Sequence, residues 1–285
     1  MSTSAITIVK SGHWVKRVLT RKVKHQVAIH LTQVLLLGVL VGTWQLLVSV
    51  GVLRDAFVSE PSQIVPAFMN GIEHGQLLNM MGVTLYETFV GFGVSVVGGM
   101  LVGFLMDEFR FLAAVINPFL TAFNSLPRIA LAPLFVLWFG LGSLSRIVLI
   151  ISLSFFIVTF NTFAGLQNVN RDHLLLARIL GASRRERFLK FVLPSAAPTI
   201  FNGIQLALTY AFLGAVVGEM LSGSQGIGGY LSLQLGSFDT TDFFAALVLL
   251  VIVALIVSGL LRALERRLLK WRVIELKGAR KALQE

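Results

Sequence analysis

The chain has 285 residues, of which 55% are hydrophobic and only 13% are charged, with 24 basic against 14 acidic side chains. Soluble globular domains contain about 25% charged residues, so this composition excludes an ordinary soluble protein and indicates an all-α integral membrane protein. There is no cysteine and the five histidines are scattered, which excludes disulfides and Cys-ligated metal sites, and we expect no metal centre.

Apolar segments long enough to cross a membrane follow one another along the chain, since such a helix needs roughly 20 residues. They are residues 27–50, 82–106, 111–144, 147–166, 199–220 and 243–261. The third segment is interrupted by Pro118, Pro127 and Pro133. Taken alone, it fits either two short spans or one broken span with a re-entrant piece.

The charges at the two ends of the chain decide between these counts. Residues 1–26 hold six basic and no acidic side chains, and residues 262–285 hold eight basic and three acidic ones. Basic segments favour the cytoplasmic side, so both termini are expected there and the number of spans must be even. Counting the third segment as one crossing gives about six spans. This predicts a basic N-terminal segment (1–26), a membrane domain (27–264) and a basic C-terminal tail (265–285).

The loops agree with this orientation. The loop 168–198 falls inside, with six basic and two acidic residues, whereas loops 51–81 and 221–242 fall outside, with one basic and five acidic residues between them. The net charge of +10 is therefore mainly a topology signal, together with attraction to anionic lipid. We expect membrane lipid, and no nucleic acid, among the partners.

Small residues line one face of two predicted spans. They recur at four-residue spacing in both spans, as Gly91, Ser95, Gly99 and Gly103, and as Ala207, Ala211 and Ala215. Such faces let helix backbones approach closely within lipid. The pattern fits ordinary packing within a bundle, and it also fits faces that slide during transport.

The inside loop 168–198 carries more pattern than a connection needs. Residues 172–180 have amphipathic helical spacing, and Gly181 is expected to end that helix. Ser183 can cap a second short helix, with Glu186 three residues later in the capping-box arrangement. Leu193 and Pro194, followed by Pro198, are expected to end this element and to begin the next span. A helix–Gly–helix elbow of this kind is suited to docking a soluble partner.

This loop resembles the cytoplasmic loop of binding-protein-dependent ABC importer permeases. That signature has Glu-Ala-Ala, three residues, Gly, nine residues, then an aliphatic residue, any residue and Leu-Pro. Matches at the right spacing are Ala177, Gly181, Leu193 and Pro194; departures are Leu175, Leu176 and Phe191. The departure at Leu175 removes the charge that this position usually carries.

Further stretches are similar to one branch of that family. They are residues 125–142, 161–170 and 218–231. They look like the permeases that import nitrate, taurine, aliphatic sulfonates and related small anions, and the resemblance covers about 57–267.

The resemblance implies the architecture and the partners. It implies a type I ABC importer permease in a bacterial inner membrane, paired with a second copy of itself, two cytoplasmic ABC ATPases and an extracytoplasmic binding protein. It implies a coupling helix in the loop 168–198, and the expected ATPase-coupling residues are Ala177, Gly181, Ala182, Ser183, Leu193 and Pro194. The chain has no G-x-x-x-x-G-K-[ST] loop. ATP and magnesium are therefore expected on the partner ATPase, and the chain itself is expected to be a transport subunit without a cofactor or catalytic residues.

Ionisable residues within spans are costly and mark candidate pathway or gate positions. The ionisable residues within the predicted spans that we consider candidates are Glu87, Arg128 and Glu219. Glu87 lies near the outer end of its span and could simply reach the interface. Arg128 follows Pro127 and could meet an anionic substrate or pair with Glu219. Glu219 precedes the glycine-rich segment 223–229 and is expected to have a structural or gating role.

Other functions fit the sequence less well. An intramembrane enzyme needs acidic, His or Ser side chains clustered at a membrane boundary, and no such cluster is evident. A simple channel gives no reason for the elbow in the loop 168–198. The cargo itself stays open, because the same machinery could import an amino acid or a vitamin precursor.

Overall fold

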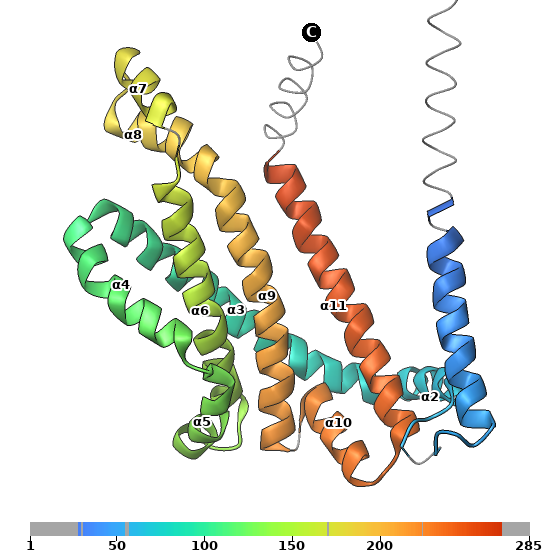
Figure 1. Cartoon of the computed structure of the whole chain (residues 1–285). Coiled ribbons are helices and arrows are strands. Elements are labelled where there is room, and N and C mark those ends of the chain that lie inside the picture. The colour runs from blue at the N-terminus through green and yellow to red at the C-terminus, as the bar shows by residue number, and fades with distance from the viewer. Residues whose placement is uncertain (1–27, 30, 55–56, 170, 224, 270–285) are drawn as a thin grey trace, which may run out of the picture. The chain divides into compact units, whose positions relative to one another are not determined.

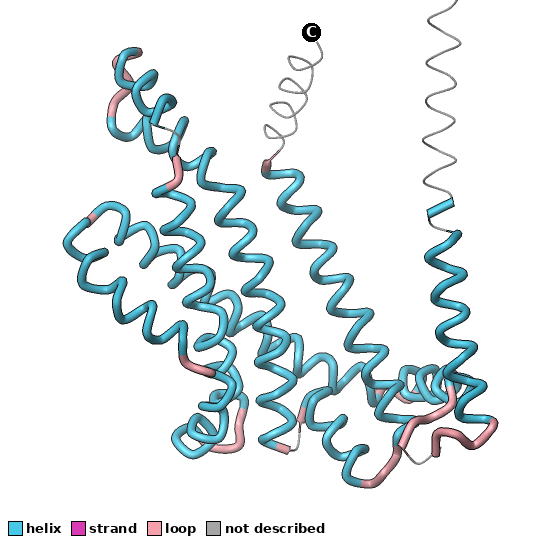
Figure 2. The backbone as a smooth tube through the Cα atoms, in the orientation of Figure 1, coloured by secondary structure: helices cyan, strands magenta, loops and turns pink. Residues whose placement is uncertain are grey.

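The computed structural model describes residues 28–29, 31–54, 57–169, 171–223 and 225–269. Every regular element in these residues is helical (Figure 2). The predicted basic segment 1–26 and the tail beyond Leu269 lie outside the described residues, so their cytoplasmic placement stays a prediction. The chain divides into two compact units, Met1–Pro66 and Ala67–Glu285.

The first unit contains an apolar helix, Leu31–Ser49, and the start of α2 (Pro61–Glu73). The helix exposes most of its large apolar side chains, as expected for a surface that faces lipid. Gln45 joins this helix to the start of α2. Its Nε2 donates to Glu60 Oε2 at 2.9 Å, and its Oε1 accepts from the Ser62 amide at 3.1 Å.

The second unit contains the remaining elements (Figure 1). In chain order they are α3 (Gln76–Glu108), α4 (Arg110–Ser125), η1 (Arg128–Leu131), α5 (Ala132–Phe139), α6 (Ser143–Gln167), α7 (Arg171–Ile179), α8 (Arg184–Arg187), η2 (Phe188–Val192), α9 (Leu193–Ser222), α10 (Gly226–Gly236) and α11 (Thr240–Leu268).

Five helices in the described residues are long and apolar enough to cross a membrane, and the count reaches six if one bent pair is a single span. That pair is α4 with η1 and α5, bent by 83°. Leu126 is extended because it precedes Pro127, and this breaks the helix there. The prediction of about six spans with a broken third one is confirmed on this counting.

The centre of the second unit is the packing of α6 against α3 and α9. A Cβ added to Gly99 would lie 2.9 Å from the Phe155 carbonyl oxygen, and one on Gly103 would lie 3.1 Å from that of Thr159. On α9, Ala207, Ala211 and Ala215 are fully buried. The small-residue faces therefore pack within the bundle, as the first of the two interpretations predicted.

The segment from Arg184 to Ser222 forms one continuous helix of 39 residues. This corrects the expectation that Leu193, Pro194 and Pro198 separate the loop element from the next span. The π-helical turn η2 ends at Val192, two residues before Pro194, and Pro198 lies inside α9. The wider turn accommodates a residue that has no backbone N–H, so the helix continues. At 1.5 Å per residue its length is about 58 Å, so it extends well beyond a bilayer core.

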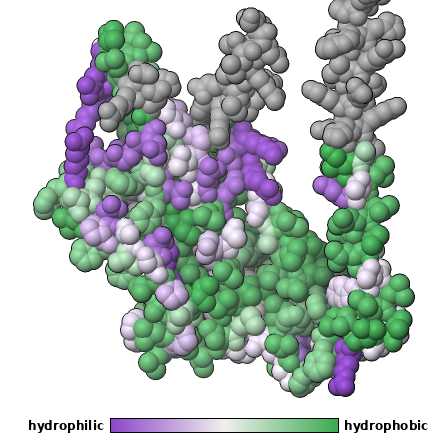
Figure 3. All heavy atoms as spheres, viewed as in Figure 1, coloured by the Kyte–Doolittle hydropathy of each residue, from purple (hydrophilic) through white to green (hydrophobic). Residues whose placement is uncertain are grey.

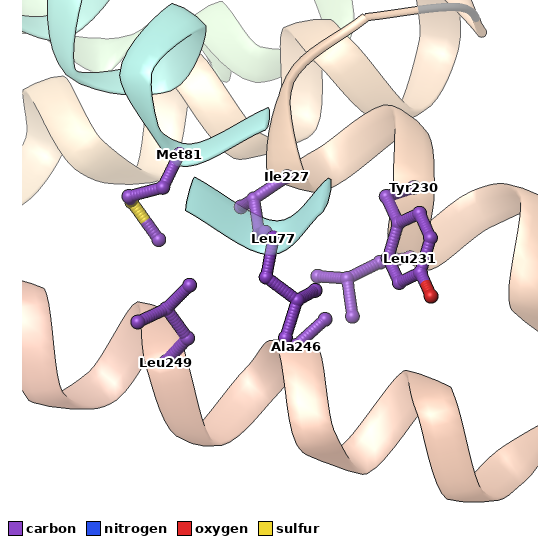
Figure 4. Close-up of a cluster of buried hydrophobic side chains, with 7 residues drawn as sticks. All are labelled: Leu77, Met81, Ile227, Tyr230, Leu231, Ala246 and Leu249. Atoms are coloured by element: carbon purple, nitrogen blue, oxygen red, sulfur yellow. The ribbon is translucent and has the colours of Figure 1, made fainter. Parts of the chain in front are cut away.

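The predicted outer loop 221–242 contains the helix α10, which packs between α3 and α11. Seven buried side chains converge there (Figure 4): Leu77, Met81, Ile227, Tyr230, Leu231, Ala246 and Leu249. The Tyr230 hydroxyl donates to Asp242 Oδ2 at 2.9 Å. Burial, assisted by Asp242, raises the pKa of Tyr230 to about 12. The phenol therefore stays protonated and keeps this link at neutral pH.

Hydropathy is distributed unevenly over the second unit (Figure 3). Apolar residues cover most of the visible face, while hydrophilic residues gather around α8 and the end of α11. α8 contributes exposed Arg184 and Arg185, and α11 contributes exposed Arg262, Arg266 and Arg267. This segregation is typical of a membrane protein with one basic end.

Candidate functional site

The elbow predicted in the loop 168–198 is present between α7 and α8. Gly181 has a φ of +70°, and the Ala182 amide donates to the Ala177 carbonyl oxygen at 3.0 Å. This geometry ends α7 with a left-handed residue, a conformation that favours glycine. Ala177 is fully buried, so it anchors α7 to the rest of the segment.

The predicted capping box at the start of α8 is confirmed. The Ser183 hydroxyl accepts from the Glu186 amide at 3.3 Å, and the Ser183 amide donates to Glu186 Oε2 at 3.1 Å. Lys190 Nζ also donates to Glu186 Oε1 at 2.9 Å. The two bonds between Ser183 and Glu186 satisfy backbone N–H groups at the start of the continuous helix.

The elbow presents an apolar surface, which we call the elbow face. It consists of Leu175, Leu176, Ile179 and Leu180, each more than half exposed. Arginines of α8 lie next to it along the chain, and Arg184 pairs with Glu108 at the end of α3. A contiguous group of exposed aliphatic side chains at the polar end of the unit is typical of a surface that binds another protein. Leu193 and Pro194 lie farther along, half-buried at the start of α9.

Glu219 lies in a buried polar cluster where α9, α3 and the start of α10 meet. Its Oε2 accepts from Thr84 Oγ1 at 3.0 Å and from the Gly228 amide at 2.7 Å. Thr84 Oγ1 in turn accepts from the Ile227 amide at 2.8 Å. The two side chains therefore satisfy backbone groups in the first turn of α10.

Two glycines allow the backbone to approach Glu219. Gly226 has a φ of +80°, and a Cβ there would overlap the Glu219 carboxylate. A Cβ at Gly228 would lie 2.9 Å from Glu219 Cβ. The predicted structural role of Glu219 has a geometric basis here, whereas its gating role stays a prediction.

Glu87 faces the interior of the unit and is fully buried. Its Oε1 lies 3.3 Å from Arg146 Nη1, an ion-pair distance without hydrogen-bond alignment. Arg146 is 2% exposed and donates to the carbonyl oxygens of Gln225 at 3.2 Å and Gly142 at 3.3 Å. The interpretation that Glu87 reaches the interface is wrong, because its side chain is fully buried and lies at ion-pair distance from Arg146 of α6.

Arg146 is not among the predicted candidate residues. It directly precedes the predicted fourth span, residues 147–166, whereas α6 begins at Ser143 and has Arg146 in its first turn. The available signal was that this arginine directly adjoins an uncharged apolar segment. Pairing it with Glu87 needs the packing of α6 on α3, which spacing along the chain does not reveal.

Arg128 lies apart from these charges and does not pair with Glu219. Its Nη1 donates to the carbonyl oxygens of Ser152 at 2.7 Å and Leu153 at 3.4 Å, and its Nη2 donates to Asn124 Oδ1 at 2.7 Å. The pairing with Glu219 is therefore wrong, since each group has other partners. Arg128 instead borders a cavity of about 520 Å³ between η1, α6 and α9.

Comparisons with known proteins bear on the bundle and the elbow together. The family described as "Binding-protein-dependent transport system inner membrane component" matches residues 95–270. A putative aliphatic sulfonates transport permease protein, SsuC of Bacillus subtilis (strain 168), is 34% identical over 239 residues, covering 84% of this chain and 86% of that protein.

Two further proteins are similar to this chain. The formylaminopyrimidine transport permease protein ThiX of Halalkalibacterium halodurans is 32% identical over 74% of this chain and 84% of its own length. An inward-facing structure of the MetNI methionine ABC transporter has a TM-score of 0.53 and 23% identity, covering 68% of this chain and 94% of that one. The latter likeness concerns the fold.

Proposed function

We propose, from the premise that this chain belongs to the family of binding-protein-dependent transport system inner membrane components, that it forms the transmembrane pathway for a small organic or inorganic anion. We expect the transported anion to be an aliphatic sulfonate, taurine or nitrate. The chain is a non-catalytic, multi-pass transmembrane subunit of an ABC transporter in the inner membrane. Membership of this family implies an ATPase and a binding protein as partners.

The observation that carries this proposal is the elbow between α7 and α8. Gly181 and the capping box fix its shape, while the elbow face leaves four aliphatic side chains uncovered. A rigid apolar projection is suited to a groove on the ATPase, because its burial there removes apolar area from water. Movement of the ATPase would then pass through the continuous helix from Arg184 to Ser222 into the bundle.

The assembly we propose has two copies of this chain, two ATPases and one binding protein. Both termini and the elbow lie on the cytoplasmic side. The basic residues that gather around α8 and the end of α11 support this orientation.

Gly181→Asp tests the coupling role. At a φ of +70° a side chain strains the backbone, and Asp also places a charge next to Leu180 of the apolar elbow face. An ATPase co-expressed with the permease should therefore no longer co-purify with it or drive uptake. Gly236→Asp is the matched control, because Gly236 also has open space around it but an ordinary backbone conformation. Retention of the ATPase and of uptake in Gly181→Asp would refute the coupling role of the elbow.

The sulfonate cargo is supported by the similarity to the B. subtilis permease. The similarity to the formylaminopyrimidine permease favours a second candidate, a vitamin precursor. Proteoliposomes containing the permease, its ATPase and its binding protein distinguish the two. We expect ATP-dependent uptake of labelled ethanesulfonate or taurine that excess aminopyrimidine does not inhibit, and the opposite result would favour the second candidate.

A further inference from the structure

The cavity beside Arg128 has one cationic side chain among mostly apolar walls. Asn124, Arg128 and neighbouring residues of the break between α4 and η1 form one side, Leu153, Ile157 and Asn161 of α6 form another, and α9 contributes Leu206 and Tyr210. Its volume of about 520 Å³ exceeds that of a small organic anion. A short alkyl or aminoalkyl group with a charged head therefore fits together with some water.

The positive charge of Arg128 has no carboxylate partner among the residues that the structure describes. The ion pairs in that part of the chain involve other arginines and Lys190. All hydrogen bonds found for Arg128 go to neutral acceptors: two backbone carbonyls of α6 and the Asn124 amide oxygen. Its guanidinium also lies 5.0 Å from the centre of the Phe156 ring. The side chain is thus held in place while its charge stays unneutralised.

Arg128 differs in this respect from Arg146, the arginine buried between α3 and α6. Arg146 is 2% exposed and is paired with Glu87, whereas Arg128 is only partly buried and lies at the wall of a cavity. A charged group within a membrane protein is costly unless it has a counter-charge or water. The cavity supplies space for either, and an anion would supply the missing charge.

The other polar groups of the wall suit an oxyanion. The Tyr210 hydroxyl and the Asn124 amide are both able to donate hydrogen bonds. A guanidinium has five N–H donors in a fork that matches planar or tetrahedral oxyanions. The apolar walls, including Ile157 and Phe160, suit a short hydrocarbon chain.

We infer that this cavity is a transient binding site for the anionic head of the transported solute, with Arg128 as the residue that contacts it. The identity of the physiological ligand, an organic sulfonate or a similar oxyanion, rests on the proposed function. The site lies where the third span is broken, so the break exposes the arginine to the cavity.

The absence of cysteine allows a direct test of the cavity's charge selectivity. The variant is Ile157→Cys, purified and reconstituted, and the reagents are anionic sulfonatoethyl methanethiosulfonate and its cationic trimethylammonium analogue. The measured quantity is the ratio of the anionic to the cationic reaction rate. We expect this rate ratio to be higher for the thiol of this variant than for a free thiol in solution. Adding Arg128→Gln should lower this rate ratio by at least about 10-fold, because the attraction of one sign and the repulsion of the other are both lost. Arg128→Lys should restore most of it.

A neighbouring cavity provides the matched control. Thr209 and Arg262 line that cavity, and Thr209 adjoins Tyr210 in sequence. For a Thr209→Cys thiol the ratio should not respond to Arg128→Gln. A ratio at Ile157→Cys that is unchanged by Arg128→Gln, or a thiol there that neither reagent reaches, would overturn the inference.

Uptake separates failure of this site from failure of the proposed function. With the ATPase and binding protein present, Arg128→Gln should lower ethanesulfonate uptake by at least about 10-fold, while Arg110→Gln, at the start of α4, should leave it unchanged. If the wild-type assembly imports ethanesulfonate and the Arg128→Gln assembly imports it equally well, the proposed site is wrong and the proposed function still stands. If the wild-type assembly imports none of the anions, the proposed cargo is wrong, and the reagent ratio alone then decides whether the cavity attracts anions.

Discussion

At the scale of single residues, Arg146 and Arg128 differ in how their positive charges are balanced. Glu87 and Arg146 neutralise each other inside the bundle, whereas Arg128 stays without a carboxylate partner among the described residues, at the edge of a cavity. A buried pair fixes packing, and an unpaired charge beside open space is available to a ligand. This difference gives the Glu87–Arg146 pair a structural role and is the basis of the ligand-binding role proposed for Arg128.

Removal of one partner of the buried pair should destabilise the bundle strongly. Arg146→Ala leaves Glu87 buried without its cation, so we expect a loss of about 3–5 kcal/mol in the free energy of unfolding. Thermal unfolding in detergent measures this effect. The double variant Glu87→Gln with Arg146→Met should recover much of the loss, since it leaves no uncompensated charge. Equal stability of Arg146→Ala and wild type would contradict the role of the pair.

Glu219 allows its carboxyl group to be tested at nearly constant side-chain shape. In Glu219→Gln the amide oxygen can still accept from Thr84 and from the Gly228 amide. Folding and permease assembly should therefore survive, while uptake should fall because replacing the carboxyl group by an amide weakens the hydrogen bonds that hold the first turn of α10 against α3 and α9. Size-exclusion chromatography and uptake by proteoliposomes measure the two properties separately. Wild-type uptake in this variant would exclude Glu219 from the transport mechanism.

At the scale of elements, the contact between α3 and α6 depends on small residues. The added methyl group of Gly99→Ala would lie 2.9 Å from the Phe155 carbonyl oxygen, so the helices must separate. We expect a loss of roughly 1–3 kcal/mol, as for other overpacked contacts. Gly93→Ala on the same helix meets nothing within 4 Å and should be neutral or slightly stabilising. Similar melting temperatures for the two variants would show that this contact tolerates separation.

The elements differ in how well local sequence signals predict them. The spans and the Ser183–Glu186 capping box follow from local periodicity and side-chain chemistry, and both are found. The continuation of the helix through Pro194 depends on a π-turn, which local propensity does not signal. The helix α10 was not predicted, because its glycine-rich start is typical of a loop. Gly226 and Gly228 are instead needed for the close contact with Glu219.

The candidate site shows the same limit. The elbow residues from Ala177 to Ser183 are neighbours in the chain, so their arrangement was predictable. The pairs Glu87–Arg146 and Thr84–Glu219 join α3 to distant helices. Such pairs depend on which faces of the helices meet, and small-residue spacing predicts that faces pack without naming the partner face.

At the scale of the whole molecule, the proposed mechanism depends on which side of the membrane each end of the bundle faces. The elbow must lie with the ATPase, and the connection between α10 and α11 must lie on the opposite side. The natural absence of cysteine makes this testable with single thiols at exposed positions. In spheroplasts, a membrane-impermeant maleimide should label Ser237→Cys readily and should fail to label Ser183→Cys.

Inverted membrane vesicles should give the reverse pattern, because the positive-inside rule places the arginine-rich α8 in the cytoplasm. Labelling of both variants after detergent permeabilisation is the control for thiol reactivity. If Ser183→Cys is labelled from outside in intact spheroplasts, the elbow cannot contact a cytoplasmic ATPase, and energy coupling through α7 and α8 is excluded whatever the cargo.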